Sequence, residues 1–289
     1  MHLLKRSANK DADMEKVLEY VDNSFESAEE QAAFDVYDAN NINPLYGFFV
    51  ARAGLGASES MRSKLAEYND PRLSRAFITK QGASGKEQAP GTADNTVYAP
   101  NGTPEQGTSK YGTSLFMYSI SAPTLLLSYH ELKFLEAEAL CRLERDAKSA
   151  LKDAVVAGLL NAENSFTISR KELGKTLINA ASSITEAEAE SYFDNTIEAK
   201  YTAEPLKTTM IQKYFALWGA SGEATESYND VRRMKGLGEN FIELKNPNSF
   251  PLRCPYGNSD TTTNAEVKAA YGNGQYVYSE NVWWAGGSR

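Results

Sequence analysis

The sequence predicts a mainly α protein, built from antiparallel helix pairs that are joined by long irregular loops. Two observations predict this class. Apolar residues recur with helical spacing through the middle of the chain, whereas turn-forming residues concentrate in residues 80–111 and 246–289. With 289 residues, 42% of them hydrophobic, the chain suffices for one large domain or two smaller ones. The helix pairs are typical of tetratricopeptide-like packing, although no internal repeat of that kind is visible.

Helical spacing first appears near the N-terminus. Four apolar residues there follow the i, i+3, i+4, i+7 pattern of one helix face: Met14, Val17, Leu18 and Val21. A second short helix is predicted after Ser58, whose side chain can cap its first turn, and its apolar face is formed by Met61, Leu65 and Tyr68. Both segments are therefore predicted as amphipathic helices that bury one side.

The centre of the chain predicts a helical hairpin. Residues 132–143 are apolar on nearly every side, as expected of a helix that is buried on several faces. Asp146 then caps a second run, whose alanine and glycine residues permit close packing.

Further helix boundaries follow from capping residues. Two capping boxes predict helix starts, Ser169 with Glu172 and Thr185 with Glu188. Pro205 is predicted in the first turn of the next helix, and Gly219 is predicted to end it.

Residues 80–111 are predicted to form a long surface loop. Glycine, proline and small polar residues crowd this segment, and it holds too few aliphatic residues to offset the entropy of ordering its backbone. Loops of this length are uncommon in compact domains unless they are functional or mobile. Both a mobile connector and a loop that faces a ligand or partner fit the sequence.

The tail, residues 246–289, is predicted as packed irregular structure. Proline, glycine and asparagine interrupt any long element, yet the aromatic content is too high for a disordered segment. Trp283 and Trp284 are expected to pack in a core, as is Trp218 on its helix.

Charge and hydropathy exclude several classes of protein. The formal charge is −8, the pI is about 5.1, and no basic stripe appears, so we expect no nucleic-acid partner. The longest apolar run, residues 115–127, is interrupted by polar residues and is shorter than the ~20 residues that span a bilayer. We expect it to be a core segment. Residues 1–6 lack the apolar stretch of a secretory signal.

The sequence offers little material for catalysis, and we expect no catalytic residue, metal or cofactor. Its histidines are His2 and His130, and no serine lies in a Gly-x-Ser-x-Gly turn. Cys141 and Cys254 lack metal-ligand spacing and are expected to be small buried residues, although a bridge between them stays open.

Carboxylates are the alternative source of chemistry, because a glycosidase needs two of them across the scissile bond. The candidates lie at spacings typical of solvated or paired helix faces: Glu131, Glu136 and Glu138, or Asp194 and Glu198. Glu131 and Glu138 lie on a mostly apolar helix, where a buried charge must be paired. Arg232 and Arg233 are their expected partners.

An aromatic cluster is the candidate ligand-binding site. Residues 43–49 are predicted to form a loop, and we select Asn43, Tyr46 and Phe48 from it. A flat ring can stack on the apolar face of a sugar while an amide binds its hydroxyls. The alternative is that these rings only pack the loop onto the helices.

Four segments carry a resemblance to a known family. The tail reads FPLRCPYGNSD over residues 250–260 and is followed by Asn264 and by NVWW at residues 281–284. Upstream of it, in order, lie NDPRL at 69–73, YHELKFLEAEA at 129–139 and DVRR at 230–233.

Together these segments resemble SusD/RagB-type lipoproteins, the surface nutrient-binding subunits of Bacteroidetes outer-membrane uptake complexes. The tail is similar to the divergent SusD-like branch, with Gly257 and Asp260 where that branch has Pro and Glu. The resemblance implies a SusD-like α/α superhelical fold. Because family members are usually much longer, it also implies that residues 1–289 are a C-terminal portion of such a domain.

The resemblance implies binding without bond chemistry. It implies a protein on the cell-surface side of the outer membrane that captures a glycan or peptide and caps a TonB-dependent, SusC-like transporter. Its membrane contact is then only through an N-terminal lipid anchor, which this chain lacks. Two other classes stay open, a carbohydrate-active hydrolase with paired carboxylates and a helical scaffold that binds only protein.

Overall fold

The computed structural model describes residues 1, 4–52, 56–81, 86–88, 97–101, 111–173, 182–245, 249–272 and 276–287. The chain divides into two compact units, Met1–Glu243 and Leu244–Arg289, and each is described by itself.

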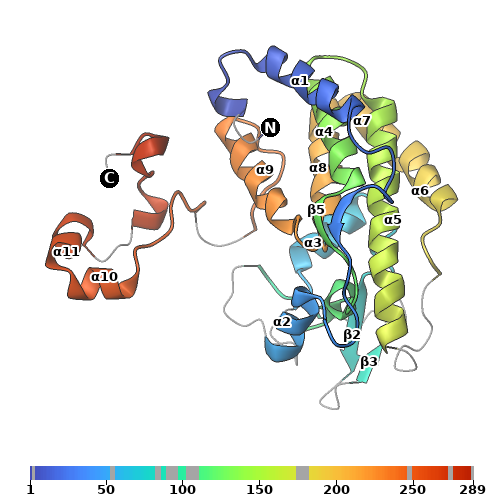
Figure 1. Cartoon of the computed structure of the whole chain (residues 1–289), viewed down its shortest axis with the longest axis horizontal. Coiled ribbons are helices and arrows are strands. Elements are labelled where there is room, and N and C mark those ends of the chain that lie inside the picture. Colours follow the sequence, from blue (N-terminus) through green and yellow to red (C-terminus); the bar gives the residue numbers. More distant parts are fainter. Residues whose placement is uncertain are drawn as a thin grey trace. The chain divides into compact units, whose positions relative to one another are not determined.

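The larger unit is mainly helical, as predicted (Figure 1). Its α-helices are α1 Lys10–Asp22, α2 Pro44–Arg52, α3 Glu59–Glu67, α4 Tyr129–Arg142, α5 Lys148–Leu173, α6 Glu186–Tyr192, α7 Glu198–Ala203, α8 Pro205–Leu217 and α9 Ala224–Gly236. Short 3-10 turns are η1 Leu4–Arg6 and η2 Leu115–Tyr118, and η4 Phe193–Ile197 is π-helical. The strands are β1 Ala32–Phe34, β2 Phe77–Gln81, β3 Lys86–Gln88, β4 Thr113–Ser114 and β5 Thr124–Leu127.

Helices α4, α5 and α8 form the centre of this unit, and they lie side by side in Figure 1. The predicted hairpin is α4 and α5. Phe134, Leu159 and Phe215 are fully buried among these helices. A Cβ on Gly158 would lie 2.9 Å from the Cβ of Ala216, so glycine lets α5 approach α8 closely. Leu115 and Phe116 are also buried, as expected of a core segment.

Most predicted helix boundaries are confirmed. The Ser58 hydroxyl accepts a hydrogen bond from the Met61 N–H, and Thr185 accepts one from the Glu188 N–H. Asp146 accepts one from the Lys148 N–H at 3.0 Å, at the start of α5. Pro205 begins α8, and Gly219 follows its end with a φ of 81°.

The predicted capping box at Ser169 is wrong. Ser169 lies inside α5, which continues to Leu173. Its side chain is fully buried and donates to the Leu115 carbonyl at 2.6 Å. A serine that satisfies its hydroxyl in this way does not interrupt a helix whose buried face continues through it.

The predicted loop over residues 43–49 is also wrong, because α2 begins at Pro44. The Asn43 side chain accepts a hydrogen bond from the Leu45 N–H at 2.8 Å. Proline tolerates the first helical turn, where its missing donor has no partner to lose. The pair Asn43-Pro44 therefore starts a helix here.

The segment predicted as a long loop begins with a β-hairpin. Strands β2 and β3 pair antiparallel, with Thr79 opposite Gln88, and β2 also pairs antiparallel with β4. Of the remaining residues in this segment, 97–101 and 111 are described, and the others lie outside the described residues. Elsewhere, β1 and β5 form a separate antiparallel pair.

The smaller unit holds more helix than predicted. Its elements are α10 Asn258–Thr263, α11 Ala265–Tyr271, η5 Tyr276–Tyr278 and η6 Trp283–Ala285. Asn264 separates the two helices and caps α11, because its side chain accepts from the N–H groups of Glu266 and Val267. The rings of Tyr256 and Tyr271 stack with centroids 4.1 Å apart.

Two further predictions about this unit need correction. Trp283 is 74% exposed, so it does not pack in a core, and the side chain of Trp284 lies outside the described residues. Cys254 is an exposed free thiol.

The other cysteine, Cys141, lies on α4 of the larger unit. It is a half-buried free thiol, with its Sγ 3.6 Å from the Thr209 Oγ1.

Candidate ligand-binding site

The three residues selected from the sequence all lie at α2, but they differ in their surroundings. Asn43 is buried, and its amide donates to the Ala122 carbonyl at 2.7 Å while its oxygen caps the helix. This side chain therefore holds α2 in place, and solvent does not reach it. Phe48 is 52% exposed, and Tyr46 is half-buried.

Tyr46 and Phe48 do not form one platform. Residues two apart on a helix point roughly 200° away from each other. The Tyr46 hydroxyl donates to the Glu172 carboxylate at 3.3 Å, at the end of α5. Burial, followed by the neighbouring Glu172 charge, raises the pKa of Tyr46. Phe48 thus remains as a single exposed ring that could stack on a ligand.

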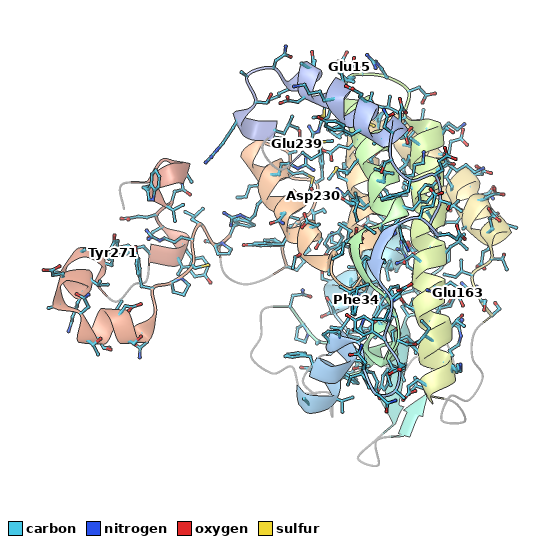
Figure 2. The ribbon with its side chains drawn as sticks, viewed as in Figure 1. Glu15, Phe34, Glu163, Asp230, Glu239 and Tyr271 are labelled. Atoms are coloured by element: carbon cyan, nitrogen blue, oxygen red, sulfur yellow. The ribbon has the colours of Figure 1, made fainter. Side chains whose placement is uncertain are left out.

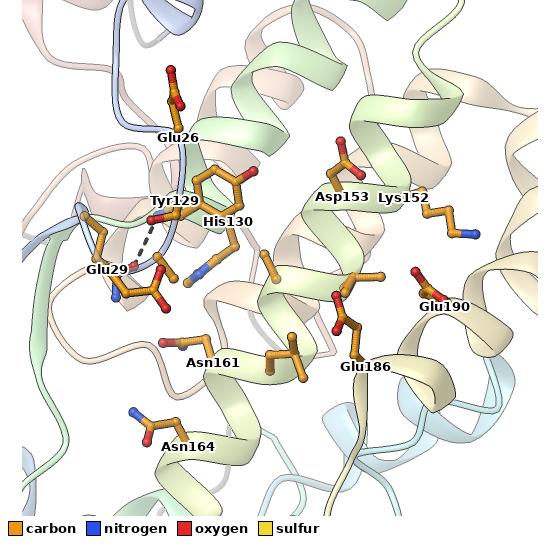
Figure 3. A pocket seen from close by; sticks show the side chains of 16 residues that line it. Glu26, Glu29, Tyr129, His130, Lys152, Asp153, Asn161, Asn164, Glu186 and Glu190 are labelled. Atoms are coloured by element: carbon orange, nitrogen blue, oxygen red, sulfur yellow. Dashed lines mark hydrogen bonds between the residues drawn. The ribbon is translucent and has the colours of Figure 1, made fainter.

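A larger site lies along α5. A groove of about 610 Å³ lies between residues 26–31, the start of α4, the outer face of α5 and the start of α6 (Figure 3). Tyr129 is among its lining residues, and its N–H donates to the Gln31 side chain at 3.2 Å. We call this site the α5 groove.

The lining of the α5 groove combines amides and carboxylates with a short apolar floor. Asn161 and Asn164 project from successive turns of α5, and Glu186 and Glu190 project from α6 (Figure 3). The floor is formed by Val156, Ala157 and Leu160. Amides donate and accept hydrogen bonds, whereas carboxylates accept them, so the groove suits a ligand rich in hydroxyl groups.

Charge in the α5 groove is mainly negative. Among the described residues that line it, the one lysine is Lys152, whose ammonium donates to the Asp194 carboxylate at 2.8 Å. The carboxylate of Glu29 is fully exposed, and its pKa is lowered by a hydrogen bond from Ser27.

His130 also lines the α5 groove, but it cannot act there as an acid or base near neutral pH. It is 1% exposed. Burial, together with the charges of Arg72 and Lys213, lowers the pKa of its imidazole to about 3. The ring is therefore neutral at pH 7.

The carboxylates considered for hydrolysis all take part in ion pairs. On the surface, Glu136 pairs with Lys133, Asp194 with Lys152, and Glu198 with Lys148. In the core, Glu138 pairs with Arg233 and Arg142, and Glu131 pairs with Lys213 at 2.9 Å. Among the described residues, no group of three or more His, Cys, Asp or Glu side chains could hold a metal ion.

The buried carboxylates form one network between α4, α8 and α9. Lys213 lies 2.9 Å from both Glu131 and Asp230, and Arg233 donates to Asp230 at 2.7 Å and to Glu138. Figure 2 labels Asp230 on α9. The predicted role of Arg233 is confirmed. The sequence did not identify Lys213 as a partner of Glu131. Arg232, the other residue predicted as a partner, donates to the Tyr228 hydroxyl at 3.3 Å.

A second buried pair explains the segment NDPRL. Asp70 and Arg72 are both nearly fully buried and pair at 2.6 Å. Arg72 also donates to the Phe215 carbonyl at 2.7 Å, which ties this turn to the end of α8.

Residues 1–256 match a family model. The model is named SusD-like, and its description is starch-binding associating with outer membrane. The chain belongs to the SusD-like family. Its resemblance to SusD/RagB-type proteins and the SusD-like helical fold are both confirmed. The family is thus one of binding proteins associated with the outer membrane.

Solved structures agree with this assignment. A SusD/RagB family protein from Bacteroides thetaiotaomicron is 65% identical to this SusD-like chain with a TM-score of 0.90, and the match covers 100% of this chain and 62% of that one. A SusD homolog from Bacteroides fragilis is 19% identical with a TM-score of 0.61, covering 96% and 63%. A chitin-binding protein is 18% identical with a TM-score of 0.61, covering 98% and 61%. The last two similarities, at 19% and 18% identity, show the fold alone.

The SusD-like chain therefore spans 62% of the length of the 65% identical protein. No curated protein sequence matches it significantly. In the part of the chain that the structure describes, no helix is both long and apolar enough to cross a bilayer.

The α5 groove was not predicted from the sequence, because its walls come from segments far apart in the chain. The local sequence carries no signal for it either. Asn161 and Asn164 lie on the outer face of α5, where an amphipathic helix ordinarily places polar residues.

Proposed function

We propose that this SusD-like chain binds a glycan or oligosaccharide as part of a nutrient-binding subunit on the cell-surface side of the outer membrane. The observation that carries the proposal is the α5 groove, a roomy polar site in a family described as starch-binding and associated with the outer membrane. The proposed partner is a TonB-dependent, SusC-like transporter that takes up the captured ligand.

The groove has the chemistry that oligosaccharide binding needs. Asn161 and Asn164 can bind adjacent hydroxyl groups, because they lie three residues apart on one helix face. The half-buried ring of Tyr129 can stack on a sugar face. The exposed ring of Phe48 on α2 is a proposed separate contact for ligand, and Tyr46 is proposed to support it from the other face of that helix.

Calorimetric titration with starch-derived oligosaccharides tests where the ligand binds. We expect the double variant Asn161→Ala/Asn164→Ala and the single variant Tyr129→Ala to lower affinity about tenfold, which corresponds to ~1.4 kcal/mol. Asn229→Ala, which removes an exposed amide from α9, is the matched control and should leave affinity unchanged.

The pattern of losses decides between the two positions. If Phe48→Ala abolishes binding while the α5 groove variants retain it, the site lies at α2 and the groove assignment is wrong. Absence of binding to any glycan, in a protein that is folded by circular dichroism, would contradict the proposed ligand class.

The proposed partner is tested separately. Purification of the full-length protein from detergent-solubilised outer membranes should bring a TonB-dependent transporter with it in stoichiometric amount. Recovery of the protein alone, in a detergent that preserves such complexes, would contradict the partner assignment without affecting the ligand assignment.

A further inference from the structure

A second cavity, of about 480 Å³, lies between α1, β5, α4, α8 and the start of α9. It shares no lining residue with the α5 groove. One wall is apolar and includes Val17, Val21, Leu127, Leu132 and Leu135. The lining also carries four carboxylates, Glu131, Glu223, Glu226 and Asp230, together with two cationic groups, the Lys213 ammonium and the Met1 amino group.

Three of these carboxylates leave an oxygen without a hydrogen-bond partner, but that of Asp230 lies 2.9 Å from the Lys213 ammonium. The other two belong to Glu131 and Glu223. Glu131 is 7% exposed, and its Oε1 lies 2.9 Å from the Lys213 ammonium while its Oε2 has no partner. Glu223 is 3% exposed, and its Oε1 accepts from the Ser128 N–H at 2.6 Å while its Oε2 has no partner. Buried polar atoms are rarely left unpaired, so these two oxygens indicate a missing donor.

The charged groups around the cavity do not supply that donor. Lys213 is shared between Glu131 and Asp230, at 2.9 Å from each. The His130 Nε2 lies 3.7 Å from the free oxygen of Glu223, which is too long for a hydrogen bond, and that imidazole is neutral. The Met1 amino group and the hydroxyls of Tyr20 and Ser24 also line the cavity, but neither free oxygen has any of them as a hydrogen-bond partner. The four carboxylates therefore outnumber the two cations of the lining.

The rim of the cavity is apolar and exposed. Tyr20 on α1 is 69% exposed and Leu126 on β5 is 71% exposed, and both line this cavity. A molecule that enters would pass apolar surface before it reaches the carboxylates. This order of surfaces matches a molecule with an apolar stem and a donor-rich cationic head.

We propose that this cavity binds an amphipathic organic cation, with a primary ammonium group between Glu131 and Glu223 and an apolar stem against α1 and β5. An ammonium group has three donors and no acceptor, so it can satisfy both free oxygens and offset the surplus negative charge. The cation can be a free alkylamine or the lysine side chain of a peptide, since both present the same chemistry.

The protonation of Glu131 makes the proposed binding depend on pH. Burial raises the pKa of Glu131 to about 7, against the opposing effect of Lys213. The titratable groups that line the cavity with it are Lys213, Asp230, Glu223, Glu226 and the amino group of Met1, and His130 lies 3.7 Å from Glu223. A bound ammonium stabilises the ionised form of Glu131, so binding below about pH 7 should release a proton.

Titration calorimetry with three probes tests the proposal on the whole chain. The probes are n-hexylammonium, the neutral n-hexanol, and Nα-acetyl-lysine amide. We expect n-hexylammonium to bind at least about tenfold more tightly than n-hexanol, because only the amine pairs with the carboxylates. Titration in buffers of different ionisation enthalpy should detect proton release. Binding of the lysine amide would identify a peptide as the source of the cation, and its absence would identify a free amine.

Variants locate the site. Glu131→Gln/Glu223→Gln should lower the affinity for n-hexylammonium about tenfold or more. Tyr20→Ala, at a position that is 69% exposed, should weaken the binding of both hexyl probes to a similar degree. Glu19→Gln is the matched control, because it removes an exposed carboxylate next to Tyr20 that does not line the cavity.

Three results would overturn the proposal. They are equal affinity for n-hexanol and n-hexylammonium, no binding of either amine at millimolar concentration, and unchanged affinity in a folded Glu131→Gln/Glu223→Gln protein. If that double variant does not fold, the amine-against-alcohol comparison and Tyr20→Ala still decide the question.

Discussion

Glu138 is a fully buried carboxylate that accepts hydrogen bonds from two arginines on different segments. Burial alone would raise its pKa, but Arg233, Lys213 and Arg142 lower it below the usual value. Removal of one member of such a network leaves the remaining charges buried without partners. The side chains of Glu138 and Arg233 thus hold α4 and α9 together.

We therefore predict that Glu138→Gln lowers the free energy of unfolding by about 3–5 kcal/mol. Glu136→Gln is the matched control on the same helix, because Glu136 pairs with Lys133 nearer the surface, and its loss should change stability by less than ~1 kcal/mol. Urea denaturation of the two variants checks the difference. Equal losses would show that the buried network adds nothing beyond a surface pair.

A second prediction concerns the pH dependence of stability. The pKa of Glu131 is about 7 in the folded chain, against 4.5 for an ordinary glutamate, so between these values the folded chain holds a proton that the unfolded chain releases. The contribution of this group to stability is therefore fully present below pH 4.5 and is lost as pH rises through about 7.

Relative to Glu131→Gln, the wild-type chain should lose on the order of 1–3 kcal/mol of stability between about pH 5 and about pH 8. Denaturation at both pH values measures this change, with Glu136→Gln as the control whose difference from wild type should stay constant. A constant difference for Glu131→Gln as well would show that Glu131 is ionised throughout.

At residue level, the sequence predicted that the buried glutamates are paired, but it did not identify every residue that pairs with them. Two glutamates seven apart on an apolar helix predicted buried pairs, because a buried charge needs a counter-charge. The sequence could not select Lys213, since the approach of α8 to α4 depends on tertiary packing. It also could not show that Asn43 is buried, because asparagine serves equally well as a helix cap and as a ligand donor.

At the level of elements, Gly219 illustrates how a helix end is enforced. It follows α8 with a φ of 81°, and a Cβ at this position would overlap the ring of Phe116. Gly238 follows α9 with a nearly equal φ of 82°, but a Cβ there meets nothing within 4 Å. The two glycines share backbone strain and differ in packing.

This pair gives a third prediction. Gly238→Ala should cost about 1 kcal/mol, which is the strain of a left-handed backbone on alanine. Gly219→Ala should cost at least about 1–3 kcal/mol more, because Phe116 or the turn must shift. Thermal unfolding of both variants tests this order. Equal costs would mean that the Phe116 ring moves aside freely.

A fourth prediction distinguishes two tryptophans. Trp218 packs against Phe77 and Phe116, with ring centroids 5.3 Å and 5.1 Å away, so Trp218→Ala should cost about 3 kcal/mol or more. Trp283 is 74% exposed, and its replacement by alanine should change stability by less than ~0.5 kcal/mol. Melting temperatures of the two variants check this, and a large loss for Trp283→Ala would show that its ring is covered.

Helix starts were predictable from capping residues where no buried helix face continued through the cap. Ser58, Asp146 and Thr185 each cap a helix as expected. Ser169 with Glu172 has the same local pattern, yet Ser169 is inside α5, because the buried face of the helix continues through it. Local capping energy of about 1 kcal/mol is smaller than the burial that this longer helix gains.

At the scale of the whole molecule, periodicity predicted the helical class and four short segments predicted the SusD-like family. The α5 groove could not be predicted, since it arises where residues 26–31, α4, α5 and α6 meet. No local spacing encodes that meeting. The division into Met1–Glu243 and Leu244–Arg289 coincides closely with the change in composition near residue 246.

The central claim is that the protein captures a glycan and leaves its bonds intact. Titration of the full-length protein with a panel of glycans, combined with analysis of reducing ends in each mixture, tests it most directly. We predict saturable binding with a dissociation constant in the micromolar to millimolar range, roughly −8 to −4 kcal/mol, and no new reducing ends. New reducing ends that scale with protein concentration and disappear when a carboxylate is replaced would contradict it.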